Sequence, residues 1–136
     1  ELNLYDRDWP VWTYQTQMPP AKFIFDDEGR RGEAIDSMVA GGCIISGARI
    51  KRSVISSGSH IHSYSLIKDS VLLPRVEVGR NCRIQNAVID KGTLIPDGTI
   101  IGENPQEDAK RFFVEERSGI VLITPDMFGQ KLHKVR

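Results

Sequence analysis

Two histidines, His60 and His62, are the side chains best suited to acid–base chemistry, and they flank Ile61. In an extended strand this spacing puts both imidazoles on the face opposite Ile61. A surface imidazole can act as the general base of an acyl transfer. One function that the sequence allows is therefore an acyltransferase that uses His60 or His62. Solvated polar positions are the simpler interpretation, because no protruding loop is predicted that could wall an acyl-carrier cleft.

Other catalytic patterns are missing from the sequence. It contains no Ser-His-Asp pattern, no HExxH and no Walker loop, and it has three histidines in all. Cys43 and Cys82 lack metal-ligand spacing, and two free thiols fit a reducing cytoplasm. We therefore expect no catalytic residue, metal ligand or cofactor in this chain, and a cytoplasmic location.

The overall composition excludes several partner classes. The chain has 136 residues, 40% of them hydrophobic and 26% charged, with a formal net charge of zero. A neutral chain has no global field to attract nucleic acid or a membrane surface. No apolar run approaches the roughly 20 residues of a membrane span. The chain opens at Glu1 without a methionine, so we expect a fragment of a longer protein.

The elements that must position these side chains follow an internal repeat. Steps of six, five and six residues lead from one branched aliphatic residue to the next across the middle of the chain. The landings are Ile44, Ile50, Ile55, Ile61, Ile67, Leu72, Val78, Ile84, Ile89, Ile95 and Ile101. The steps sum to a period of about 17 residues, and a fixed period of this length is typical of stacked repeats.

The spacing predicts three short strands per 17 residues, each with one apolar residue pointing inward. Stacking such triangular coils about 4.8 Å apart pairs each strand in parallel with its counterpart one turn later. Ser53, Ser70 and Ala87 share one column, as a tight corner requires. The pattern resembles the hexapeptide repeat of left-handed parallel β-helices, although crossovers are usually right-handed. A sandwich of regularly spaced strands is the structural alternative.

Three regions follow from this pattern, and the fold class is all-β. We expect an extended interdomain arm over 1–33, a left-handed β-helix of about four coils over 34–102, and a helix-strand-helix cap over 103–136. The arm carries Trp9, Trp12, Tyr14 and Phe23 and a polar turn at 26–32. A one-residue slip is expected near Ile35–Val39, before the regular columns begin.

The C-terminal region begins with a helix-start pattern. Asn104 is placed to cap the helix, Pro105 fits its first position, and Glu107 could close a capping box. A helix to about Glu116 would shield the open end of the prism. The β-rich run 119–124 and a second short helix beginning at Thr124-Pro125 complete the cap.

Several local motifs resemble the C-terminal part of bacterial glucose-1-phosphate adenylyltransferases. They are the segments 4–10, 19–23, 41–47, 71–74, 95–96, 101–104 and 119–122, in order along the whole chain. The resemblance implies an enzyme that makes ADP-glucose and pyrophosphate from ATP and glucose 1-phosphate with Mg²⁺, in glycogen synthesis. It also implies that the N-terminal catalytic domain precedes Glu1 and that this fragment alone is inactive.

The resemblance further implies a regulatory and oligomerisation role. In that family the β-helix supports a homotetramer and helps to bind phosphorylated metabolite effectors, with AMP-type inhibitors, between domains. Lys91, after Ile89-Asp90, matches the basic residue that contacts effector phosphate, and Gly41 and Gly42 match the Gly-Gly loop of the regulatory interface.

Two further positions depart from the family pattern. The second and third basic positions of the family hold Pro125 and Gly129 here. This departure puts an activator of the fructose 1,6-bisphosphate type in doubt. Lys131, Lys134 or Arg136 could substitute for the two missing cations.

Overall fold

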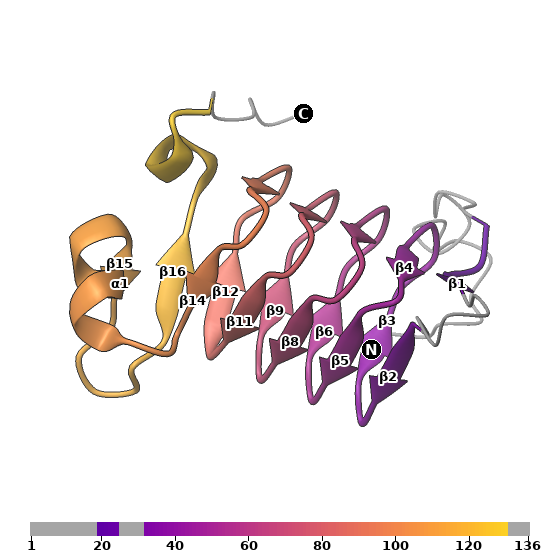
Figure 1. Cartoon of the computed structure of the whole chain (residues 1–136), viewed down its shortest axis with the longest axis horizontal. Coiled ribbons are helices and arrows are strands. Elements are labelled where there is room, and N and C mark those ends of the chain that lie inside the picture. The colour runs from indigo at the N-terminus through magenta and orange to yellow at the C-terminus, as the bar shows by residue number, and fades with distance from the viewer. Residues whose placement is uncertain (1–18, 25–31, 131–136) are drawn as a thin grey trace, which may run out of the picture.

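Short parallel strands wind the chain into a three-sided prism (Figure 1). The computed structural model describes residues 19–24 and 32–130. The aromatic residues Trp9, Trp12 and Tyr14, most of the polar turn and the basic tail lie outside the described residues. The parallel β-helix of about four coils that the repeat predicts is confirmed, with the left hand that the hexapeptide resemblance implies.

Each side of the prism is one sheet, in which successive coils contribute one strand each. The first sheet contains β1 (Lys22–Ile24), β4 (Ile44–Ser46), β7 (His60–Ile61), β10 (Glu77–Val78) and β13 (Leu94–Ile95). The second contains β2 (Glu33–Ile35), β5 (Arg49–Lys51), β8 (Leu66–Lys68), β11 (Arg83–Gln85) and β14 (Ile100–Ile101). The third contains β3 (Met38–Val39), β6 (Val54–Ile55), β9 (Val71–Leu72), β12 (Ala87–Ile89), β16 (Val121–Ile123) and β15 (Phe113–Val114).

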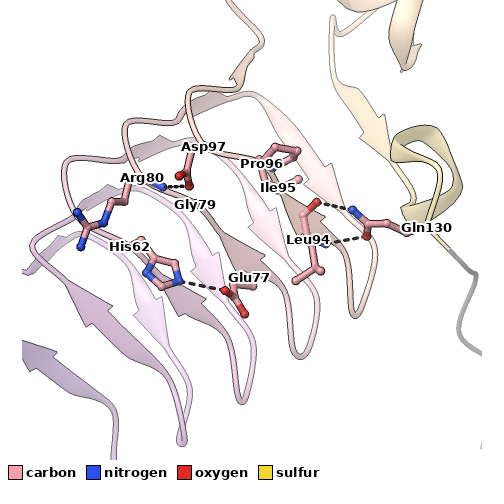
Figure 2. A pocket seen from close by; sticks show the side chains of 9 residues that line it. All are labelled: His62, Glu77, Gly79, Arg80, Leu94, Ile95, Pro96, Asp97 and Gln130. Atoms are coloured by element: carbon pink, nitrogen blue, oxygen red, sulfur yellow. Dashed lines mark hydrogen bonds and ion pairs between the residues drawn. The ribbon is translucent and has the colours of Figure 1, made fainter.

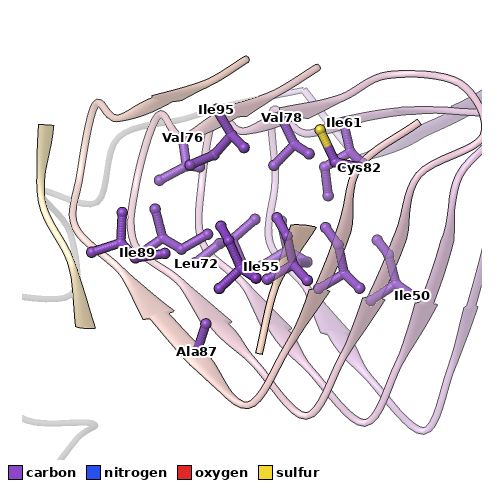
Figure 3. Packing of buried hydrophobic residues seen from close by; sticks show 14 of the residues in the cluster. Ile50, Ile55, Ile61, Leu72, Val76, Val78, Cys82, Ala87, Ile89 and Ile95 are labelled. Carbon is purple, nitrogen blue, oxygen red and sulfur yellow. The ribbon is translucent and has the colours of Figure 1, made fainter. Parts of the chain in front are cut away.

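The apolar columns fill the inside of the prism. Val78 is the register partner of both Ile61 and Ile95, and all three side chains are buried. Figure 3 shows Ile55, Leu72 and Ile89 stacked in the same way in another column. Because each inward side chain has a counterpart about 4.8 Å above and below, the prism has one continuous apolar core.

One member of the predicted columns is wrong. Ile45, not Ile44, is the register partner of Ile61, and Ile45 is fully buried whereas Ile44 points outward. The physical reason is a shorter turn, because only Gly47 separates β4 from the buried corner residue Ala48. The corresponding turns of later coils contain one residue more. The one-residue slip therefore lies at Gly47 rather than near Ile35–Val39.

Buried hydroxyl groups connect the coils at the corners. Ser53 Oγ accepts the Ser70 N–H at 3.1 Å and donates to the Lys51 carbonyl at 2.8 Å. Ser70 Oγ repeats this arrangement with the Ala87 N–H and the Lys68 carbonyl. Small polar residues at these corners thus satisfy backbone groups that the turn leaves unpaired, in addition to fitting the tight space.

The C-terminal region covers the end of the prism. The helix α1 (Pro105–Arg111) is shorter than predicted because the chain becomes extended at Phe112 and enters β15, which pairs antiparallel with β16. Asn104 accepts the N–H groups of Gln106 and Glu107, as expected of an N-cap. The predicted capping box does not form among the described residues, because no hydrogen bond joins the Asn104 N–H to Glu107, and Glu107 Oε1 lies 3.5 Å from Lys110 Nζ instead.

Besides β15, two strands outside the regular coils extend the sheets. β1 lies within the range expected for the arm and pairs in parallel with β4. β16 lies within the range expected for the cap and pairs in parallel with β12. The short 3-10 helix η2 (Pro125–Phe128) then follows, where a second helix is predicted.

A side-chain amide covers the last strand of the first sheet. Gln130 Nε2 donates to the Leu94 carbonyl at 2.7 Å, and Gln130 Oε1 accepts the Leu94 N–H at 3.0 Å. The amide thereby takes the place that the next strand would occupy, and it protects an exposed edge.

The register correction predicts different costs for two neighbouring isoleucines. Ile45→Ala should lower the free energy of unfolding by about 2–5 kcal/mol, because it opens a cavity in the core. Ile44→Ala should cost about 1 kcal/mol or less. Urea unfolding of the two variants measures the difference. Equal costs, or the reverse order, would contradict the assigned register.

Candidate functional site

Four stacked turns form the edge between the third and the first sheet. We call this the glycine edge, and it consists of Gly41–Gly42, Ser57–Gly58, Pro74–Arg75 and Lys91–Gly92. Backbone hydrogen bonds of 3.0–3.2 Å join each turn to the next, from Gly58 to Gly41, from Arg75 to Ser57 and from Gly92 to Pro74. These bonds hold the side chains of the edge in fixed rows.

The predicted effector residues lie on this edge but do not meet. Gly41 and Gly42 belong to its first turn and Lys91 to its fourth, so a coil spacing of 4.8 Å separates them by roughly 14 Å. One phosphate group spans far less than this distance. Lys91 is half-buried, its N–H is held by Asp90 Oδ1 at 2.8 Å, and no ion pair of its ammonium occurs among the described residues.

The sequence reasoning missed Arg75 on the same edge. Its φ of 59° is left-handed, whereas the corresponding positions of the other three turns hold Gly42, Gly58 and Gly92, with φ of 78°, 72° and 70°. A side chain in this region costs about 1–2 kcal/mol relative to glycine. The repeat itself contained the signal, because Arg75 stands 17 residues after Gly58 and 17 before Gly92.

The two positions that depart from the family pattern lie in and after η2. Pro125 begins this helix and is buried, and Gly129 ends it with a left-handed φ of 73°. Neither supplies a cation. The basic residues that could replace them, Lys131, Lys134 and Arg136, lie outside the described residues.

A second candidate site lies on the outer face of the first sheet. The His60 and His62 rings stack there with centroids 4.0 Å apart and planes 24° from parallel. His62 Nε2 lies 3.1 Å from Glu77 Oε2, and His60 Nε2 lies 3.5 Å from Ser46 Oγ. His62, Glu77 and Arg80 line a groove of about 570 Å³. Figure 2 shows these side chains beside one another.

Burial lowers the pKa of His60 below its ordinary value. The neighbouring His62 lowers this pKa further, and the Glu77 carboxylate partly opposes both effects. A neutral imidazole can accept a proton. Each ring already has a polar neighbour, Ser46 for His60 and Glu77 for His62, and the two rings stack on each other. Within residues 19–24 and 32–130 no three His, Cys, Asp or Glu side chains come together to hold a metal.

The two cysteines are buried at corners. Cys43 donates to the Ser56 carbonyl and Cys82 to the Pro96 carbonyl, each at 3.1 Å. Burial raises the pKa of both thiols, so both stay protonated at neutral pH. Each cysteine occupies a corner position that holds serine or threonine in other coils, and a protonated thiol is a poor nucleophile.

Comparison with known proteins decides the family. The family model described as "GlmU-like, C-terminal hexapeptide" matches residues 19–123, which cover most of the chain. The chain belongs to this family. The matched residues carry the 17-residue pattern that builds the three sheets. No helix in the described part of the chain is long and apolar enough to cross a membrane.

Several curated relatives are glucose-1-phosphate adenylyltransferases. Glucose-1-phosphate adenylyltransferase of Hydrogenovibrio crunogenus is 79% identical over all 136 residues, which cover 32% of that protein. The enzymes of the same name from Thiobacillus denitrificans and Methylococcus capsulatus are 68% and 61% identical over 97% and 98% of the chain. The chain spans about a third of the length of these relatives. The acyltransferase alternative is therefore not favoured.

The environment of His60 predicts a pH effect on stability. Because its pKa is lowered in the folded state, the unfolded state binds more protons as the pH falls below about 6.5. His60 should therefore contribute a loss of stability from pH 7 to pH 5.5, and His60→Gln should remove that contribution. Urea midpoints of both proteins at the two pH values measure the effect, and the other titrating groups cancel in the comparison. Identical pH dependence in both proteins would contradict the burial argument.

Proposed function

We propose that this chain is the C-terminal regulatory and assembly domain of a cytoplasmic glucose-1-phosphate adenylyltransferase. The observation that carries the proposal is the 79% identity over the whole chain to one third of an enzyme of that name. The complete enzyme would form ADP-glucose and pyrophosphate from ATP and glucose 1-phosphate with Mg²⁺, for glycogen synthesis. The reaction is assigned to a catalytic domain in the remaining part of the enzyme, because this chain covers only about a third of its relatives.

The glycine edge is the proposed place for phosphorylated effectors. Lys91 would donate to an effector phosphate, and charge-assisted hydrogen bonds of this kind contribute about 1.5–3 kcal/mol. Gly41 and Gly42 would form a separate contact at the other end of the edge, where the lack of side chains lets a neighbouring domain approach closely. The hydrogen-bonded turns make the edge a rigid surface.

Regulation then follows from differential binding. An effector changes turnover only if it binds one arrangement of the two domains more tightly than the other. A phosphate held between Lys91 and the catalytic domain would favour the arrangement in which both sides contact it. The prism itself need not change shape.

Replacement of Lys91 tests the effector site. In the complete enzyme, Lys91→Ala should weaken effector binding about tenfold to a hundredfold, at about 1.4 kcal/mol per factor of ten. Turnover without effector should change little, because Lys91 is not proposed to contact the phosphates that react. Effector titrations of turnover measure the shift, with Lys110→Ala on the exposed side of α1 as the control. Titrations that stay unchanged in Lys91→Ala would remove Lys91 from the site.

The outer face of the third sheet is the proposed contact between copies in a homotetramer. Its outward residues from successive strands are all apolar: Met38, Val54, Val71, Val88, Leu122 and Phe113. Met38 is 71% exposed and Phe113 56% exposed. A continuous apolar stripe of this kind marks an interaction surface.

Charge favours a second copy of the same chain as the occupant. The stripe carries no charge, so two identical faces can meet without repulsion. The adjoining edge carries the Arg52–Asp69 pair, and a two-fold axis between these coils would set each charge opposite its counterion in the partner. The second sheet differs, because its outward Lys51 and Lys68 are direct neighbours and would repel an identical face.

Two matched substitutions test the assembly surface. Val54→Lys should reduce the mass of the complete enzyme in solution, because it buries a charge in the contact. Ile100→Lys on the second sheet should leave the mass unchanged, although the exposed fractions of the two residues are similar, 39% and 43%. Sedimentation equilibrium measures both masses. A Val54→Lys enzyme of unchanged mass, with altered contact to the catalytic domain, would assign the stripe to that domain instead.

A further inference from the structure

Arg75 and Lys91 are close neighbours on the glycine edge. The Gly92 N–H donates to the Pro74 carbonyl at 3.0 Å, so these two turns stack directly. Arg75 is offset from Lys91 by one residue along the chain and by one coil. Their Cα atoms are therefore roughly 6 Å apart, close enough for both side chains to reach one anion.

The carboxylates nearest to the two cations along the chain have other hydrogen-bond partners. Asp90 Oδ1 accepts the Lys91 N–H, and Glu77 Oε2 lies beside His62 Nε2. Neither Arg75 nor Lys91 forms an ion pair with any residue in 19–24 or 32–130, whereas Arg52 pairs with Asp69 on another edge. Two like charges on adjacent coils repel each other, and an anion between them would relieve this repulsion.

Backbone conformation makes arginine an unfavourable choice at position 75. Every other turn of the edge has glycine at the corresponding left-handed position. An exposed side chain that is strained, unpaired and beside a second cation has no stabilising role that accounts for it. Strain of this kind is typical of residues that are retained for binding.

We infer that Arg75 and Lys91 together hold one phosphate group of a phosphorylated metabolite. Arg75 would bind two phosphate oxygens through its planar guanidinium, and Lys91 would add a point charge. Arg75 would thus supply the second cation that Pro125 and Gly129 do not. This inference rests on the proposed effector function and adds to it a residue and a ligand class.

The test measures binding to the complete enzyme by titration calorimetry. The probes are inorganic phosphate, fructose 1,6-bisphosphate and AMP, and the variants are Arg75→Gly, Arg75→Lys and Lys91→Ala. Arg75→Gly is preferred to alanine because glycine occupies the other three turns, so the fold should be at least as stable by urea unfolding. Arg117→Ala, which removes an exposed arginine in a distant turn, is the matched control.

At least one probe should bind the unmodified enzyme. Arg75→Gly and Lys91→Ala should each weaken the binding of that probe about tenfold or more. Arg75→Lys should retain most of the affinity and Arg117→Ala all of it. If the substitutions weaken the binding of inorganic phosphate as well as that of the organic probes, the site is a general anion site. If they weaken the binding of the organic probes alone, it is a metabolite site. Both results support the inference.

Other results overturn it in distinguishable ways. If Lys91→Ala weakens binding and Arg75→Gly does not, Arg75 is excluded and the effector function of Lys91 stands. If neither variant changes binding while effectors still alter turnover, the effector site lies elsewhere and both proposals fail. If none of the three probes binds the complete enzyme, the phosphate site is excluded.

Discussion

The stacking of each coil directly on the one before is the constraint from which the rest of the structure follows. Parallel pairing puts residues 17 apart in the same column, so Ile61, Val78 and Ile95 fill one part of the core. Buried hydroxyls such as Ser70 Oγ connect the coils where strand pairing ends. Because backbone hydrogen bonds also join the turns, exposed side chains stand in rows whose spacing the backbone determines.

This geometry decides which residues can act together. Whether two side chains can bind one ligand depends on how many coils separate them, more than on their distance along the sequence. Lys91 and Gly41 lie on one edge but three coils apart, so they cannot bind one phosphate between them. Arg75 lies one coil from Lys91 and can act with it. For the same reason the outward apolar residues of successive coils form one stripe on the third sheet. The outward Lys51 and Lys68 likewise lie side by side on the second sheet.

Much of the fold could be predicted from the period, and the errors have local causes. Ile44 and Ile45 are equally apolar, and only the short turn at Gly47 decides which one points inward. The end of α1 depends on the pairing of β15 with β16, which overrides local helix preference. The Gln130 contact joins residues 36 positions apart and has no local signal. The position of Lys91 in a turn follows from the period, whereas Arg75 is found only when the turns are compared as well as the apolar columns.

We propose that effectors act on the glycine edge of this domain. Hydrogen exchange of the complete enzyme, with and without an effector that changes its turnover, tests the claim most directly. We expect slower exchange in the turns at Arg75–Val76 and Lys91–Thr93, with no change at the edge around Arg52 and Asp69. An effector that alters turnover while leaving exchange at both glycine-edge turns unchanged would contradict the account.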